Sequence, residues 1–298
     1  MAQQTAALGP APAGLLVDAH HHLWDTPTAE EYPWMGPAHA AIRRAFLPSD
    51  LKPLLDAAGF AATIVVQARQ SLAETEWLLQ QAQAHPWIAG VVGWVDLRAE
   101  PQELQAQLAR FAAHPKLVGV RHVVHDEPED DFCVQPAFRR GIGALQAHGL
   151  AYDLLLFPRH LRYAAALARE FPAQRFVLDH IGNPATARGA ALPQDWLADL
   201  QALAACPNVH CKLSGLVTKF EPLGAWAAQD FHAALAAVLA AFGPARCMVG
   251  SDWPVALLGA KDYASCMAIV VDFCRARLAP EEAAGVLGGN ARAFYRCR

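Results

Sequence analysis

The segment Leu15-Leu16-Val17-Asp18-Ala19-His20-His21-His22 is a short apolar run that ends in three consecutive histidines. Side chains on a strand alternate between its two faces, so we expect Asp18, His20 and His22 to point the same way. Two imidazoles on one face of a buried strand predict a binding or catalytic site, and a hydrogen-bonded pair of core histidines is the alternative. Later apolar runs also end in chemically active residues, at Asp179-His180 and at Ser251-Asp252-Trp253-Pro254, which favours a functional site.

Continuous apolar runs rich in β-branched residues recur along the chain, and such runs are typical of parallel strands covered on both faces. We place their cores near residues 15–20, 62–67, 88–95, 117–124, 151–156, 175–180, 208–213 and 247–252. Helical patterns lie between them, at residues 71–84, 101–113, 162–170, 195–205, 225–242 and 262–277.

This alternation predicts a single-domain (β/α)8 TIM barrel over residues 14–298, preceded by a flexible tail at residues 1–13. A doubly wound open sheet is the alternative. Such a sheet normally carries a glycine-rich phosphate loop after its first strand, where this chain has histidines. The long excursion at residues 24–48 predicts a lid or substrate loop, and the acidic loop at residues 125–136 predicts a solvated surface.

Composition restricts the class of protein. The 298 residues are 54% hydrophobic and 17% charged, which suits one well-buried domain, and the net charge of −4 without a dense basic patch argues against nucleic-acid binding. The seven cysteines form no Cys-x-x-Cys pair, which favours a reducing compartment and a cytoplasmic location. The sequence shows no signal peptide and no apolar run long enough to span a membrane.

In a parallel barrel the active site lies at the carboxyl ends of the strands. These ends carry polar side chains throughout, which predicts an enzyme and makes a barrel used only for binding a weaker reading. The candidate catalytic residues are His20, His22, His180 and Asp252. The candidate substrate-binding residues are Gln67, Trp94, Arg121, His122, Asp153, Lys212 and Trp253.

Five motifs together resemble the amidohydrolase superfamily: Asp18-Ala19-His20-His21-His22, Gly119-Val120-Arg121-His122, Leu178-Asp179-His180-Ile181-Gly182-Asn183-Pro184, Lys212-Leu213-Ser214-Gly215 and Gly250-Ser251-Asp252-Trp253-Pro254. More narrowly, the chain is similar to the sugar-lactone hydrolase group, the fucono- and rhamnono-lactonase-like enzymes. The resemblance covers roughly residues 15–297. It implies a barrel, a strand-eight aspartate that handles the proton of water, and hydrolysis of a lactone ring such as that of L-fuconolactone or a related deoxy- or pentonolactone.

Lactone hydrolysis needs a base for water, donors for the developing oxyanion and an acid for the leaving alkoxide. Asp252 is the candidate base, and we expect burial against Trp253 to raise its pKa. Arg121 and Lys212 could hold the carbonyl or the carboxylate product. Asp153 has an alternative role as a paired charge inside the barrel. Ser214 and Ser251 do not lie in Gly-x-Ser-x-Gly, which argues against a covalent serine mechanism.

The resemblance also bears on metals. Two-metal members of the superfamily use a strand-four lysine and a strand-five histidine, where this chain has Arg121-His122 and Asp153. His20, His22 and Asp252 could still hold one Zn²⁺. We therefore predict metal-independent hydrolysis of a small sugar lactone with optional zinc binding. A metal-dependent decarboxylase or hydrolase of the same superfamily is the alternative.

Overall fold

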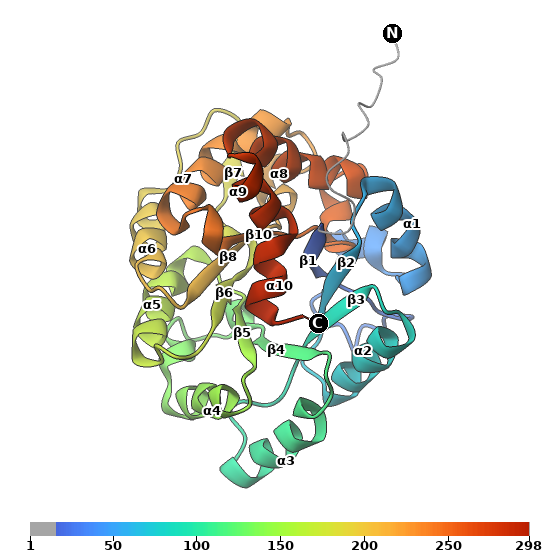
Figure 1. Cartoon of the computed structure of the whole chain (residues 1–298), viewed down its shortest axis with the longest axis vertical. Coiled ribbons are helices and arrows are strands. Elements are labelled where there is room, and N and C mark those ends of the chain that lie inside the picture. The colour runs from blue at the N-terminus through green and yellow to red at the C-terminus, as the bar shows by residue number, and fades with distance from the viewer. Residues whose placement is uncertain (1–15, 298) are drawn as a thin grey trace.

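Eight parallel strands form a nearly closed barrel with helices around it (Figure 1). The computed structural model describes residues 16–297, so the tail predicted at residues 1–13 lies outside the described residues. Neighbouring strands follow the order β1-β2-β3-β4-β5-β6-β8-β10. Their bounds are Val17–His21 (β1), Ala62–Val66 (β2), Ile88–Gly93 (β3), Leu117–His122 (β4), Ala151–Leu154 (β5), Phe176–Leu178 (β6), Val209–Leu213 (β8) and Cys247–Val249 (β10). The predicted barrel is confirmed, and the open-sheet alternative is wrong.

The barrel closes where the segment after β10 meets β1. The amide of Asp252 donates to the carbonyl of His20 at 2.8 Å, and the amide of His22 donates to the carbonyl of Trp253 at 2.7 Å. Oδ1 of Asp18 accepts from the amide of Ser251 at 2.9 Å and adds a third link. Closure therefore carries two predicted site histidines and Asp252 to the same seam.

Asp18 does not share a face with His20, contrary to the expectation from strict alternation. Its Oδ2 accepts a hydrogen bond at 3.2 Å from the hydroxyl of Tyr263, which lies on the surrounding helix α8 (Tyr263–Arg277). The pairing of β1 with β2 shifts register between Asp18 and His21. This irregularity breaks the period of two, so Asp18 secures the seam while His20 points into the barrel.

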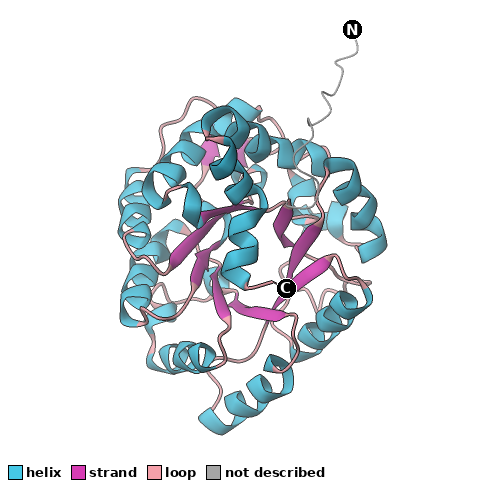
Figure 2. Cartoon of the chain, in the orientation of Figure 1, coloured by secondary structure: helices cyan, strands magenta, loops and turns pink. Residues whose placement is uncertain are grey.

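Helices α1 to α7 lie between strands along the chain, and α8 to α10 follow the last strand; Figure 2 shows the helices around the strands. Their bounds are Pro48–Ala58 (α1), Leu72–Ala84 (α2), Pro101–Ala112 (α3), Pro136–Ala147 (α4), Leu161–Glu170 (α5), Gln194–Ala204 (α6), His232–Phe242 (α7), Tyr263–Arg277 (α8), Pro280–Ala284 (α9) and Asn290–Tyr295 (α10). The helix expected over residues 225–242 is shorter, because a 3₁₀ turn at Ala228–Phe231 precedes α7 and Asp230 accepts the amide of Ala227 there. In the described part of the chain, no helix is both long and apolar enough to cross a membrane.

The core has an outer layer and an inner layer. The outer layer fills the space between the strands and the surrounding helices. The inner layer joins barrel residues such as Val17 and Ile64 to Phe294 and Tyr295 of α10. In Figure 1, α10 (red) crosses the middle of the ring of strands. The C-terminal helix therefore packs into the interior of the barrel.

Two further segments complete the fold. The excursion at residues 24–48 leaves and returns through paired backbone hydrogen bonds between Trp24 and Phe46, at 3.1 and 2.8 Å. The short strands β7 (Thr186–Ala187) and β9 (Phe220–Glu221) pair with each other outside the barrel.

We predict that Gly250→Ala destabilises the protein, because Gly250 lies at the closing seam. A Cβ at this position would be 2.7 Å from Cβ of His20 and 3.1 Å from its backbone nitrogen. Overpacking of this kind costs about 1–3 kcal/mol. Thermal denaturation should show a lower Tm. Gly36→Ala is the matched control, because a Cβ there meets nothing within 4 Å, and an equal Tm for the two variants would contradict the prediction.

Candidate active site

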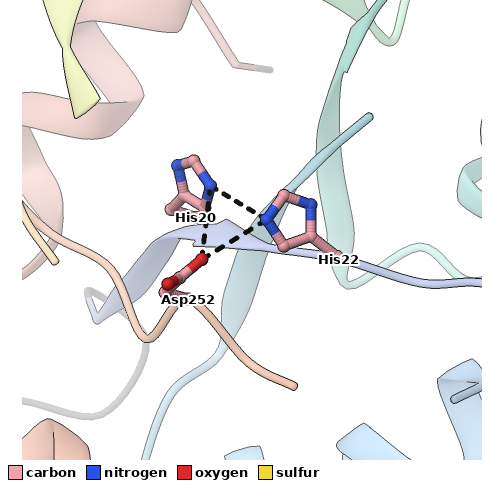
Figure 3. Close-up of side chains that lie close together, drawn as sticks. All are labelled: His20, His22 and Asp252. Carbon is pink, nitrogen blue, oxygen red and sulfur yellow. Dashed lines mark hydrogen bonds and ion pairs between the residues drawn. The ribbon is translucent and has the colours of Figure 1, made fainter. Parts of the chain in front are cut away.

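The four predicted catalytic side chains converge at one end of the barrel. His20 and His22 come from the end of β1, His180 follows β6, and Asp252 follows β10. Figure 3 shows His20, His22 and Asp252 pointing toward one another. Oδ1 of Asp252 lies 3.4 Å from Nε2 of His22, 3.8 Å from Nε2 of His20 and 3.7 Å from Nε2 of His180. The sequence therefore predicted which side chains meet, and their chemical roles remain a proposal.

Local contacts orient the imidazoles of His22 and His180. Nδ1 of His22 lies 2.8 Å from the carbonyl of Val66, which can only accept, so the proton of His22 is on Nδ1 and Nε2 is free to face Asp252. Nδ1 of His180 lies 2.9 Å from Oγ of Ser214. Gly215 follows directly with φ of 65°, and a Cβ there would be 2.5 Å from Cγ of His180. Only glycine allows this backbone to lie so close to His180.

His180 and Asp252 themselves have left-handed backbone conformations, with φ of 55° and 57°. Residues other than glycine adopt this region at a cost of about 1–3 kcal/mol, and such strain is concentrated at functional sites. Both strained residues project a side chain toward the same point, which indicates that the fold holds these two groups in place for a chemical purpose.

Beneath this site lies a buried network of four charges, which we call the ion cluster: Asp153, Lys212, Asp179 and Arg121. Nζ of Lys212 lies 2.5 Å from Oδ2 of Asp153 and 3.0 Å from Oδ1 of Asp179. Nη1 of Arg121 lies 3.0 Å from Oδ2 of Asp179. None of the four side chains is more than 3% exposed. The cluster contains two acids and two bases, so the charges balance inside the barrel.

The ion cluster contacts His20 directly. Nδ1 of His20 lies 3.0 Å from Nζ of Lys212 and 3.3 Å from Oδ1 of Asp179, and Nε2 lies 3.4 Å from Nη1 of Arg121. Burial, together with the positive charge of Lys212, holds the pKa of His20 well below its usual value. Burial also lowers the pKa of His180. Both imidazoles are therefore neutral near pH 7.

The pKa of Asp252 is lowered, contrary to the expectation from the sequence. Burial alone would raise it, but the neighbouring side chains of His180, His22 and Arg121 outweigh burial. The expectation considered only desolvation and missed these partners. Asp252 is consequently ionised at neutral pH, ready to accept a proton but a weak base, so groups that stabilise the developing charge must contribute more.

A cavity of about 1140 Å³ opens above these residues. Its lining includes His22, His180, Asp252 and Arg121. The excursion at residues 24–48 supplies Glu30, Glu31, Pro33, Trp34, Ala38 and His39 to the wall. The position of this segment in the cavity wall supports its prediction as a substrate loop. The loop expected to be a solvated surface also faces the cavity, through His125, Asp126 and Glu127.

Of the seven predicted substrate-binding residues, Arg121 lines the cavity. Gln67, Trp94, His122, Asp153, Lys212 and Trp253 are absent from its lining and lie behind it. Nη2 of Arg121 donates to Oε1 of Gln67 at 3.1 Å, and Trp94 donates to Nδ1 of His122 at 3.3 Å. His122 in turn contacts the cavity residue Glu127 at 2.6 Å.

The other predicted residues are held just as firmly. Trp253 packs edge-on against Phe46, with ring centroids 5.1 Å apart, while Asp153 and Lys212 are fully buried in the ion cluster. The alternative reading of Asp153 as a paired charge describes its observed position.

Sequence reasoning noted Asp179 at a strand end but left it out of the candidate site residues, and it missed Tyr295. Asp179 precedes His180 directly, so its position at a strand end was the available signal. Tyr295 lies at the end of a helix beyond the last strand, so a search of the strand ends does not find it. The wall residues Arg69, Gln70, Phe157 and Lys219 follow strand ends too, but only the folded loops show that they face the cavity.

A family model described as Amidohydrolase matches residues 17–297. The chain belongs to this family. Two curated relatives, from Burkholderia ambifaria and Burkholderia multivorans, are each named L-fucono-1,5-lactonase. They are 39% and 41% identical to this chain, over 94% of it and over 95% and 96% of their own lengths. A solved amidohydrolase from Burkholderia multivorans with bound zinc is 40% identical, with a TM-score of 0.90 over 96% of this chain and 100% of that one.

The donor atoms of this amidohydrolase fit one metal ion. Nε2 of His20 and Nε2 of His22 lie 3.2 Å apart, and Oδ1 of Asp252 lies 3.8 and 3.4 Å from them. Ligand atoms around tetrahedral zinc are separated by about 3.3 Å. A second group, formed by His20, Asp179 and His180, also has suitable donors. Its carboxylate is already in contact with Lys212 and Arg121, so positive charge occupies the place of a second ion.

We therefore predict that the protein binds at most one zinc ion per chain. Calorimetric titration with zinc should show a single site, and His22→Ala should weaken it because one imidazole ligand is lost. Arg69→Ala serves as the control, since Arg69 lies in the cavity wall away from the three donors. Two equivalents of tightly bound zinc would show that the ion cluster does not exclude a second metal.

Proposed function

We propose that this amidohydrolase hydrolyses a small sugar lactone to the open-chain aldonic acid. The proposal rests on the ionised carboxylate of Asp252, which shares the cavity floor with His22, the neutral imidazole of His180 and the cation Arg121. The curated relatives named L-fucono-1,5-lactonase support the same reaction class. Metal-dependent decarboxylation is less supported, because relatives at this level of identity carry lactonase names.

In the proposed reaction, Asp252 accepts a proton from water while the water oxygen forms a bond to the lactone carbonyl carbon. The carbonyl oxygen becomes an oxyanion, and the guanidinium of Arg121 in the cavity floor stabilises its charge. When the intermediate collapses, the bond from the carbonyl carbon to the ring oxygen breaks. Asp252 then returns the proton to the departing alkoxide. The products are a carboxylic acid and a free hydroxyl, and no other reactant is consumed.

His20, His22 and Asp252 would hold a zinc ion, which would polarise the carbonyl and acidify water when bound. We propose that hydrolysis does not require it. A permanent cation, Arg121, already lies 3.4 Å from Nε2 of His20 and lines the cavity. A lactone ester is also a reactive electrophile, so positive charge from the protein can replace that of a metal.

The residues behind the cavity have supporting roles in this proposal. Gln67 orients Arg121. Asp153 and Lys212 together position His20. His122, with Trp94 behind it, supports Glu127 in the cavity wall. Trp253 fixes the segment that carries Asp252. All seven cysteines, Cys133, Cys206, Cys211, Cys247, Cys266, Cys274 and Cys297, are free. We propose on that basis that the enzyme acts in a reducing compartment, in keeping with a cytoplasmic location.

We predict that Asp252→Asn lowers kcat by about 10² to 10⁴-fold, because the amide keeps the shape but cannot accept the proton. Steady-state hydrolysis of a sugar lactone, followed by proton release in a weakly buffered assay, measures the effect. Circular dichroism of the variant controls for folding. Turnover above one tenth of the wild-type rate would exclude Asp252 as the base.

The substrate should be neutral and rich in hydroxyl groups. The cavity lining contains five carboxyl side chains, Glu30, Glu31, Asp126, Glu127 and Asp252, against the three cations Arg69, Arg121 and Lys219. This excess of negative charge disfavours a dicarboxylate. The polar side chains in the lining can form hydrogen bonds with hydroxyl groups, and a ligand without hydroxyls would leave those polar groups unpaired.

We therefore predict that kcat/KM is highest for aldonolactones in a panel that also contains homoserine lactones and pyrone dicarboxylates. The same panel with a chelator should retain most of the activity. A tenfold preference for a lactone that is not a sugar would refute the substrate class. Complete loss with the chelator, restored by zinc, would instead refute metal-independence.

A further inference from the structure

Tyr295 reaches the ion cluster from the end of the barrel that α10 closes. It is the last residue of α10, the helix that crosses the ring of strands in Figure 1. Its side chain is 2% exposed and packs in the inner core layer. The cavity lies beyond the ion cluster, and Tyr295 is not part of its lining. The residue therefore cannot touch a substrate in the cavity.

The hydroxyl of Tyr295 is directed at Asp153. It lies 2.9 Å from Oδ1 and 2.8 Å from Oδ2 of this fully buried carboxylate. Burial and the neighbouring charge of Asp153 hold the pKa of Tyr295 well above its usual value, so the hydroxyl keeps its proton and donates it. A carboxylate sealed from water needs such donors, because an unpaired buried acceptor is costly.

Asp153, held by Tyr295, in turn positions the ammonium group of Lys212. An ammonium group has three N–H donors and no acceptor. Nζ of Lys212 donates to Oδ2 of Asp153 at 2.5 Å and to Nδ1 of His20 at 3.0 Å, and it forms an ion pair with Oδ1 of Asp179 at 3.0 Å. The position of Asp153 therefore determines where Nζ lies and how Lys212 meets His20.

We propose that Tyr295 is a positioning residue for the reaction, acting through Asp153 and Lys212 on the imidazole of His20. The chain of contacts runs from the C-terminal helix, through the barrel interior, to a side chain 3.8 Å from Oδ1 of Asp252. The assignment to catalysis rests on the proposed lactonase function. The structural part, that Tyr295 controls the placement of His20, does not depend on it.

Tyr295→Phe tests the proposal, because it removes the hydroxyl and keeps the ring. Loss of a group that orients a site residue lowers activity by about 10- to 100-fold. We expect the loss in kcat, with KM within about twofold, since Tyr295 does not line the cavity. Phe294→Leu is the matched control, because Phe294 is the neighbouring residue in the same core layer and its side chain has no polar group. We expect the control to lower Tm and leave kcat unchanged.

A double-mutant cycle tests whether Tyr295 acts through Asp153. If Tyr295 acts through Asp153, then Tyr295→Phe should have little further effect on kcat in an Asp153→Asn background. Full additivity of the two losses would overturn the proposed route. An unchanged kcat in Tyr295→Phe, or a loss matched by Phe294→Leu, would overturn the positioning role itself.

A measurement without turnover separates this inference from the proposed function. Protein labelled with ¹⁵N in its histidines gives ring signals by NMR, and those of His20 are identified by their absence in His20→Gln. We expect Tyr295→Phe to shift the His20 signals and Phe294→Leu to leave them in place. If the wild type hydrolyses no sugar lactone but His20 still shifts, only the proposed function fails. If His20 does not shift, the inference fails.

Discussion

The site depends on the balanced charges sealed inside the barrel. Removing an acid or a base from water costs several kcal/mol, and a partner in good geometry must offset that cost. Lys212 meets both Asp153 and Asp179, and Arg121 meets the second oxygen of Asp179. Loss of any one member would leave an opposite charge buried without its partner. The ion cluster therefore holds Arg121 in the cavity lining and His20 beside it.

The charges of the ion cluster also influence the protonation states of His20 and Asp252. Burial and the nearby charge of Lys212 keep the imidazole of His20 neutral, and the groups around Asp252 keep its carboxylate ionised. A neutral imidazole beside an ionised aspartate suits acceptance of a proton from water. In the proposed reaction, the cation Arg121, which lines the cavity, stabilises the developing oxyanion. In metal-dependent members of such a family, a bound ion provides that charge. Here the protein contributes part of it itself, while three donors remain able to hold one ion.

Much of this arrangement could be predicted from strand ends. Continuous apolar runs located the eight strands, and parallel strands place their carboxyl ends together, so His20, His22, His180 and Asp252 were expected to meet. Contacts that depend on irregular geometry could not be predicted. The register shift in β1 turns Asp18 toward α8, and the pKa of Asp252 depends on partners from three other strands. Tyr295 is remote in sequence from every residue it holds, and no periodic pattern marks it.

In the proposed mechanism, Asp252 activates water for attack on the carbonyl carbon and never bonds to the substrate itself. A single turnover in H₂¹⁸O, with enzyme in excess over an aldonolactone, tests it most directly. We expect one heavy oxygen in the carboxylate of the product, none in the released hydroxyl, and none in the peptide that contains Asp252. Label in that peptide would show that the aspartate attacks the substrate as a nucleophile. Label in the hydroxyl would show that the other ester bond breaks, and either result would contradict the mechanism.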